Sequence, residues 1–130
     1  KFTAPAGSLD RLAQDGATQF AVDEVEGALW TVGKHSFVLP EDRRVPAAKE
    51  TARWEFGQAM EELARRLGER AFIAAEGFTV PDLLLGHCAS WAEAAKMPMP
   101  GGAVGAYFER LRARPALGRA MRRAAQASVS

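Results

Sequence analysis

Apolar residues recur along most of the chain at the three- and four-residue spacing of an α-helix, whereas the alternation typical of β-strands is almost absent. Prolines and glycines divide this pattern into about five pieces. The pattern predicts helices over residues 8–33, 46–68 and 79–96, a short helix around 104–111 and a last one from Pro115. A loop at residues 34–45 and a crossing segment at 69–78 join them. We therefore expect an all-α bundle of about five helices in a single domain, residues 1–130.

The first predicted helix, capped by Ser8, has two apolar sides. One stripe consists of Leu9, Leu12, Gly16, Phe20, Gly27 and Trp30, and the other of Val22, Val25, Leu29 and Val32. A helix with one apolar side needs one neighbour, and this helix needs two. We expect one side to face the core of the domain and the other to face a second domain or subunit.

The helix predicted over residues 79–96 begins with a strong start signal. Thr79 and Asp82 have the spacing of a capping box, in which a hydroxyl and a carboxylate satisfy each other's backbone donors. Phe78 precedes the cap, at the spacing to pack on Leu83 as a hydrophobic staple. Beyond the cap, apolar residues that include Trp91 cover nearly the whole circumference. A helix that is apolar on all sides is buried on all sides, so we expect it to be the central helix.

The other helices have one apolar face each. The residues expected to point inward are Ala52, Phe56, Ala59, Met60, Leu63 and Leu67 of the second helix, Val104, Tyr107, Phe108 and Leu111 of the short helix, and Leu117, Ala120, Met121 and Ala124 of the last. Six arginines between positions 110 and 123 make the C-terminal stretch basic. With few aromatic residues among them, they indicate a solvated surface rather than a nucleic-acid interface.

Composition and charge narrow the classes of function. The chain holds 17 basic and 16 acidic residues, a formal net charge of +1, which argues against whole-domain binding to nucleic acid. Its single cysteine, Cys88, excludes an internal disulfide and indicates an intracellular protein. Because no run of about 18 apolar residues and no signal-peptide core occurs, we expect a cytoplasmic protein with no membrane partner.

A search for catalytic residues finds no constellation. Cys88 lies among leucines, where a thiol is inert unless something lowers its pKa. His87 has no serine or cysteine nucleophile at a partner spacing, and we expect it to be buried and bonded to a backbone carbonyl. His35 adjoins a loop and is expected to be exposed. Two histidines without a helical ligand spacing predict no metal site.

Aromatic residues are the remaining candidates for a binding site. Six of them could line an apolar pocket: Phe20, Trp30, Trp54, Phe56, Trp91 and Tyr107. An all-α domain of this size needs at least four of the six for its core, so the pattern leaves at most two for a ligand.

Several motifs together resemble a known family. They are the run from Gly77 to Leu85 (GFTVPDLLL), then Trp91-Ala92, Tyr107-Phe108-Glu109-Arg110-Leu111 and Arg114-Pro115-Ala116. In order and spacing they resemble the C-terminal helical domain of cytosolic glutathione transferases, in which an F-T-x-A-D phrase opens the central helix and an R-L-x-x-R-P phrase joins the last two. The resemblance covers residues 8–121. Pro81 stands where the family usually has alanine, but near a helix start its missing N–H costs little.

The resemblance implies a two-domain protein. In the family a thioredoxin-like N-terminal domain binds the co-substrate glutathione and supplies the Tyr, Ser or Cys that activates its thiol, so this chain is expected to hold no catalytic residue and no metal ligand. Residues 1–7 are expected to be the linker from that domain. The family implies that Val22, Val25 and Leu29 form a pocket wall for the electrophile and that Gln19 is a polar contact near glutathione. It also implies a homodimer through the first two helices.

The sequence leaves three functions open. The first is conjugation of glutathione to a small electrophile, with the 130-residue piece alone inactive. The second is a non-catalytic protein-interaction module, since this helical fold also serves in translation and stress-response assemblies. The third is isomerisation or peroxide reduction with glutathione. A thioredoxin-like domain with a Tyr, Ser or Cys near its first strand–helix turn would support an enzyme.

Overall fold

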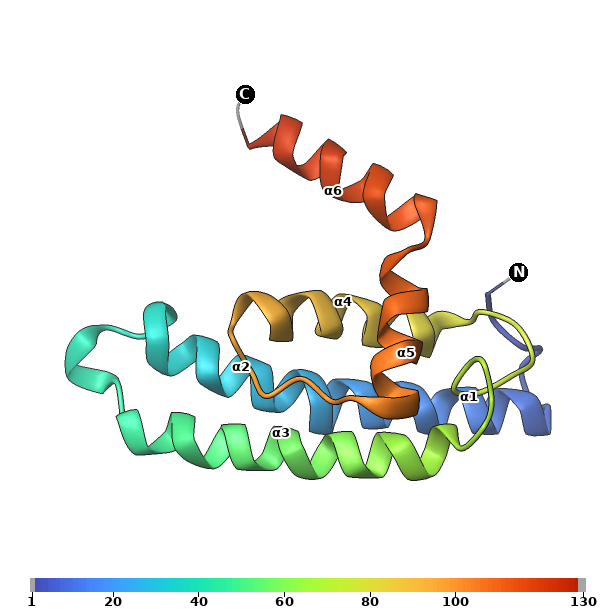
Figure 1. The fold of residues 1–130 in the computed structure, drawn as a ribbon, viewed down its shortest axis with the longest axis horizontal. Helices are drawn as coiled ribbons and strands as arrows, with labels where there is room; N and C mark the ends of the chain where they lie inside the picture. The colour runs from blue at the N-terminus through green and yellow to red at the C-terminus, as the bar shows by residue number, and fades with distance from the viewer. Residues whose placement is uncertain (1, 129–130) are drawn as a thin grey trace.

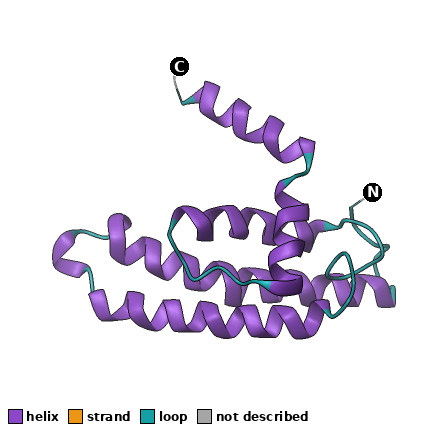
Figure 2. Ribbon diagram, in the orientation of Figure 1, coloured by secondary structure: helices purple, strands orange, loops and turns teal. Residues whose placement is uncertain are grey.

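Helices make up the fold, as the sequence predicts. The computed structural model describes residues 2–128, and within that range every residue lies in a helix or a loop (Figures 1 and 2). In chain order the elements are α1 (Leu9–Phe20), η1 (Ala21–Glu26), α2 (Gly27–Gly33), η2 (Lys34–Val38), η3 (Glu41–Arg43), α3 (Pro46–Leu67), α4 (Val80–Ala94), α5 (Gly102–Arg112) and α6 (Pro115–Ala127). The all-α class is confirmed.

The first four elements, α1 to η2, follow one another without a break and form one long rod (Figure 1). Ser8 caps its start by accepting a hydrogen bond from the Arg11 N–H at 3.1 Å. The rod continues to Val38, so the prediction that a loop begins at residue 34 is wrong. The difference is η2, a π-helical stretch that continues the rod past Gly33 and ends before Pro40 and the charged run 41–44, the features that indicated a loop.

The helix α3 runs antiparallel beside α2 (Figure 1). Pro46 opens it at a position where a missing N–H leaves no helical bond unmade. Gly68 ends it with φ of 55°, a left-handed conformation that glycine adopts at little cost. The buried residues of α3 are the six predicted ones: Ala52, Phe56, Ala59, Met60, Leu63 and Leu67.

The helix α4 packs against the rod on one side and against α5 on another. Its residues Leu85, Ala89 and Ala92 are fully buried. Gly86 allows α5 to come close, because a Cβ at this position would lie 3.3 Å from Cβ of Leu111. The domain core therefore lies between the rod, α3, α4 and α5, with Tyr107 of α5 among its largest fully buried side chains.

One side of α4 is uncovered, which corrects the expectation that this helix is enclosed all round. Leu83 is 57% exposed, His87 is exposed and Trp91 is only half-buried. The other described elements pack on the opposite side of α4, so its apolar circumference overstates its burial. His87 is likewise not the buried histidine that the sequence predicts.

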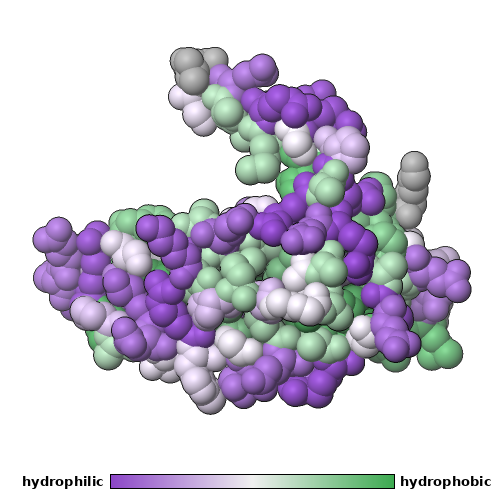
Figure 3. Space-filling view, viewed as in Figure 1, coloured by the Kyte–Doolittle hydropathy of each residue, from purple (hydrophilic) through white to green (hydrophobic). Residues whose placement is uncertain are grey.

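The last helix, α6, leaves the body of the fold (Figure 1). It has no buried residue, and Met121 is 59% exposed. The predicted inward packing of Leu117, Ala120, Met121 and Ala124 is therefore wrong. The cause is the turn before Pro115, which directs the new helix away from the core. Figure 3 shows apolar side chains on the side of α6 toward the body and hydrophilic ones on its outer side.

The expected linker is held against the helical body. Lys1 lies outside the described residues. From Phe2 on, the chain is tied down, because Gln14 accepts a hydrogen bond from the Ala4 N–H at 2.8 Å and Val80 N–H donates to the Phe2 carbonyl at 3.1 Å. None of the helices within residues 2–128 has both the length and the apolar character to cross a membrane.

Candidate functional site

The residues expected to contact ligands, three in a pocket wall and Gln19 near glutathione, divide into two pairs. Gln19 and Val22 are exposed, Val22 to 42%, and Gln19 donates a hydrogen bond to the Asp23 carboxylate. Val25 and Leu29 have no exposed surface. Their positions on the rod turn both side chains into the core, and their role in a ligand-contacting wall stays a prediction.

A wide open depression lies between the rod and α3, and we name it the α2–α3 groove. It is lined by Asp23, Glu24, Gly27, Ala28, Trp30, Thr31, Lys34, Trp54, Glu55, Gln58, Ala59, Glu62 and Arg65. Trp30 is 45% and Trp54 65% exposed, so two of the six candidate aromatic residues lie outside the core. Glu62 is engaged by Arg65 at 3.0 Å and by Arg66 at 2.7 Å. The groove therefore offers aromatic contact area beside carboxylates.

The aromatic surface extends from the rod to α4. The rings of Trp30 and Trp91 meet edge to face with centroids 6.2 Å apart. Trp91 also lies 6.1 Å from the His87 ring. The sequence predicts Trp91 in the core, whereas in the structure it belongs to the edge of this exposed aromatic surface.

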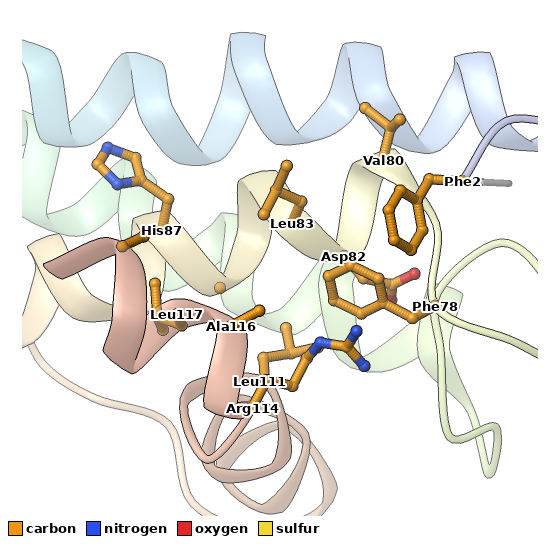
Figure 4. Close-up of a pocket in the computed structure, with 12 residues that line it drawn as sticks. Phe2, Phe78, Val80, Asp82, Leu83, His87, Leu111, Arg114, Ala116 and Leu117 are labelled. Carbon is orange, nitrogen blue, oxygen red and sulfur yellow. The ribbon is translucent and has the colours of Figure 1, made fainter. Parts of the chain in front are cut away.

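A second depression, the α4–α6 cleft, is a cavity of about 220 Å³ with almost wholly apolar walls. Figure 4 shows Leu83 and His87 of α4 on one side, Leu117 of α6 opposite, and the rings of Phe2 and Phe78 at one end. A mostly apolar space of this size accommodates a single aromatic ring or a short alkyl chain.

The aromatic end of this cleft is a stack of rings and a cation. Phe78 packs edge to face on Phe2 at 5.8 Å and on Phe72 at 6.2 Å, and the Arg114 guanidinium lies 3.6 Å above its ring. Leu83 lines the same cleft but remains 57% exposed. The staple between Phe78 and Leu83 therefore stays a prediction.

The capping box is present at the start of α4. Asp82 accepts hydrogen bonds from the Thr79 N–H at 2.9 Å and from its hydroxyl at 3.1 Å. The other carboxylate oxygen of Asp82, which is fully buried, accepts from Ile73 N–H at 3.0 Å and from the Tyr107 hydroxyl at 2.8 Å. Burial and the adjacent carboxylate raise the pKa of Tyr107. This constellation holds three segments together.

Nucleophilic chemistry finds no support at Cys88. The side chain is 1% exposed, and burial, together with the charge of Glu26, raises the pKa of its thiol to about 12. A buried neutral thiol is a poor nucleophile.

His35 is half-buried and its Nδ1 accepts a hydrogen bond from Val45 N–H at 3.0 Å, so its expected exposure is wrong. Among residues 2–128, no three His, Cys, Asp or Glu side chains gather as metal ligands.

Sequence reasoning names Trp54 only as one of six aromatic candidates, without identifying it as exposed, and misses Phe2. Trp54 falls outside the apolar stripe of α3, which runs through Ala52 and Phe56, and that offset is the signal that could have identified it as exposed. Phe2 has no periodic context, since it precedes the first helix. Its place in the α4–α6 cleft depends on a backbone hydrogen bond to Val80, which no local pattern reveals.

Comparison with known proteins shows which folds this chain is similar to. No protein-family model matches the sequence, and no curated protein is significantly similar to it. Several solved structures are similar, and three of them are glutathione S-transferase structures. A glutathione S-transferase domain-containing protein of Marinobacter aquaeolei VT8 is 23% identical, with a TM-score of 0.77 over 89% of this chain and 59% of that one.

The second is the glutathione S-transferase of a sphingomonad, solved in complex with glutathione. It is 25% identical, with a TM-score of 0.73 over 93% of this chain and 57% of that one. The third, the theta class glutathione S-transferase of Xanthomonas axonopodis pv. citri, is 21% identical, with a TM-score of 0.64 over 88% of this chain and 62% of that one. The chain thus spans 57 to 62% of the length of these structures. It has the all-helical fold of the C-terminal domain of glutathione S-transferases.

Proposed function

We propose that this chain is the helical half of a glutathione S-transferase-like protein that conjugates glutathione to small electrophiles. The observation that carries the proposal is the likeness, over 93% of this chain, to a glutathione S-transferase solved with glutathione. The exposed apolar surface of the rod supports this proposal. In this proposal a thioredoxin-like domain binds glutathione and lowers the pKa of its thiol, and this chain holds the acceptor beside the sulfur.

The proposed reaction divides the work between two surfaces. The thiolate sulfur attacks an electrophilic carbon, a C–S bond forms, and a leaving group such as chloride departs with its electron pair. Val22 contributes an apolar contact to the acceptor and Gln19 a polar contact near glutathione. Val25 and Leu29 act from behind the wall, by fixing the rod on the core. The gain in rate from this half comes from orientation.

Two experiments test the enzymatic proposal. The full-length product is expected to bind immobilised glutathione and to conjugate a chloro-aromatic acceptor, while the 130-residue chain alone does neither. Failure of the full-length product in both assays would reject the enzyme. Val22→Trp in that product is expected to change KM for the acceptor several-fold and leave KM for glutathione unchanged. Leu9→Trp, at a position of the same rod that is 83% exposed, is the matched control.

We also propose self-association through the first two helices, the rod and α3. Trp30 and Trp54 support it, because large exposed aromatic side chains are characteristic of protein interfaces. Sedimentation equilibrium of the chain over a range of concentrations is expected to show dimers. A monomer at every concentration would reject this part of the proposal.

The same groove favours a second candidate function, a non-catalytic protein-interaction module. Acidic side chains around two exposed tryptophans suit a basic helical partner. The two candidates differ in what Trp54→Ala does in the full-length product. A module loses its partner while any glutathione binding persists, whereas an enzyme of the first kind keeps its turnover.

A further inference from the structure

The α4–α6 cleft is large enough and open enough to take a small molecule. Its volume is about 220 Å³, whereas a cavity of about 150 Å³ already holds benzene. On its α4 side Leu83 is 57% exposed, and on its other side α6 has no buried residue. We propose that this cleft binds a small carboxylate with an aromatic or short alkyl body. The proposal goes beyond the conjugation proposed above and does not depend on it.

The walls of the cleft suit the apolar body of such a ligand. Leu83 of α4 and Leu117 of α6 lie on opposite walls, and Ala120 extends the α6 wall by one turn (Figure 4). The rings of Phe2 and Phe78 close one end. A ring or chain between these walls removes apolar surface of the ligand and of both helices from water, which favours binding.

Arg114 supplies a cation at the aromatic end of the cleft. Its side chain is half-buried, and its guanidinium lies 3.6 Å above the Phe78 ring. Within residues 2–128 this guanidinium forms no ion pair and donates no hydrogen bond. Stacking on a ring occupies the face of a guanidinium and leaves its N–H edge for a carboxylate, which it can bind with two parallel hydrogen bonds.

Asp82 is the carboxylate among the described residues that line the cleft, and its hydrogen-bonding capacity is used within the fold. It is fully buried and accepts from Ile73, Thr79 and Tyr107. No ion pair joins it to Arg114. A carboxylate of the ligand therefore meets a guanidinium whose donors are unused, and the cleft combines an apolar space with one charge complementary to an anion.

A ligand in the cleft would contact α4 and α6 together. Because α6 has no buried residue of its own, a molecule that packs on Leu83 and Leu117 at once is expected to hold this helix on the body. Binding and the attachment of α6 are then linked, since a ligand stabilises the state that it binds.

Calorimetric titration of the chain with phenylacetate tests the charge. Phenylacetamide has nearly the same shape and no charge, and it is expected to bind at least about tenfold more weakly. Arg114→Gln is expected to weaken phenylacetate to the same degree and to leave phenylacetamide unchanged, which shows that the cleft itself is intact. Arg119→Gln removes an exposed arginine of α6 that does not line the cleft, and it is the matched control with little effect.

Filling the cleft tests the place of binding. Ala120→Phe puts a ring into the space between the helices and is expected to abolish binding of both compounds. Ala125→Phe adds the same ring at an exposed position of α6 outside the cleft, and it is expected to bind as wild type does. Circular dichroism checks the fold of both variants. Equal binding by the two variants overturns the proposal.

Hydrogen exchange tests the link to α6. Saturating phenylacetate is expected to slow exchange of the α6 amides at least about tenfold in wild type and to have no effect in Ala120→Phe. No binding of phenylacetate by the chain, or equal binding by wild type and Arg114→Gln, overturns the proposal. So does binding by the chain that is lost in the full-length product, because the cleft would then be closed in the working protein.

The outcomes for the cleft and for conjugation are separable. If the full-length product binds phenylacetate and fails to bind glutathione or to conjugate an acceptor, the cleft assignment stands and the proposed enzyme is rejected. If it conjugates an acceptor and neither it nor the chain binds phenylacetate, the enzyme stands and the cleft assignment is rejected.

Discussion

Four hydrogen bonds converge on the carboxylate of Asp82. Its carboxylate joins the start of α4, the loop before it and α5, through Thr79, Ile73 and Tyr107. The sequence shows only the capping part, because the other two partners lie 9 and 25 residues away along the chain. A cap residue can thus have a larger role in stability than local spacing indicates.

Asp82→Ala is therefore expected to cost more than the loss of a cap. Replacing a capping residue alone costs about 1 kcal/mol, which is our expectation for Thr79→Ala. Asp82→Ala also leaves Ile73 N–H and the Tyr107 hydroxyl buried without a partner, which raises the expected loss to about 3 kcal/mol or more. Urea unfolding of both variants, with Tyr107→Phe as the control for one bond, measures this. Equal losses for Thr79→Ala and Asp82→Ala would limit Asp82 to capping.

Cys88 makes stability depend on pH in the alkaline range. Its pKa rises from an ordinary 9.0 to about 12 in the folded chain, so the folded state holds this proton more tightly than the unfolded state. Its contribution is complete below pH 9 and is lost as the pH rises toward 12. Over that interval the free energy of unfolding falls by up to about 1.4 kcal/mol per pH unit for this one proton.

Cys88→Ala is expected to flatten this dependence. The variant is less stable at every pH because it leaves a small cavity, but its slope between pH 9 and about 11 is smaller by one proton. Tyr107, whose pKa is also raised, keeps part of the slope in both proteins. Guanidinium unfolding at a series of pH values compares the slopes. Parallel curves would mean that the Cys88 thiol ionises as freely in the folded chain as in the unfolded one.

At the scale of elements, the sequence predicts helices well where they keep regular spacing and poorly where they do not. The buried face of α3 and the start of α4 follow from spacing and capping alone. The end of the first rod does not, because η2 continues the helix with π turns. The apolar residues of α4 and α6 predict amphipathic helices but not which neighbours cover them, since that depends on the direction of turns such as Ala113–Arg114.

Two glycines, Gly86 and Gly105, allow α5 to pack closely on its neighbours. Gly105→Ala would place a Cβ 2.8 Å from the Pro100 carbonyl oxygen, and backbone cannot move aside as a side chain can. We expect a loss of about 1 to 3 kcal/mol. Gly57→Ala in α3 is the matched control, because its Cβ meets no atom within 4 Å, and it is expected to stabilise the helix by about 0.5 to 1 kcal/mol. Thermal unfolding of the two variants measures the opposite signs.

At the scale of the whole molecule, the sequence identifies the fold but only part of the candidate site. The motifs from Gly77 to Ala116 identify the helical domain, because they lie in the core and its caps, where spacing reflects structure. The sequence does not show which of the expected pocket-wall residues are exposed. Val25 and Leu29 are apolar like Val22, and only the three-dimensional packing shows that they are buried and it is exposed. Exposure of an apolar residue is a property of the whole fold.

The attachment of α6 gives the last prediction, which concerns the molecule as a whole. In one copy α6 makes few contacts and has no buried residue, so its amides are expected to exchange with solvent far faster than those of α3. The α3 amides are expected to exchange only with global unfolding, because six of the side chains of α3 are buried in the core. Hydrogen exchange of the chain, followed separately at the two helices, measures the difference. Equal protection of the α6 and α3 amides would show that α6 is held as firmly as the core and would contradict this prediction.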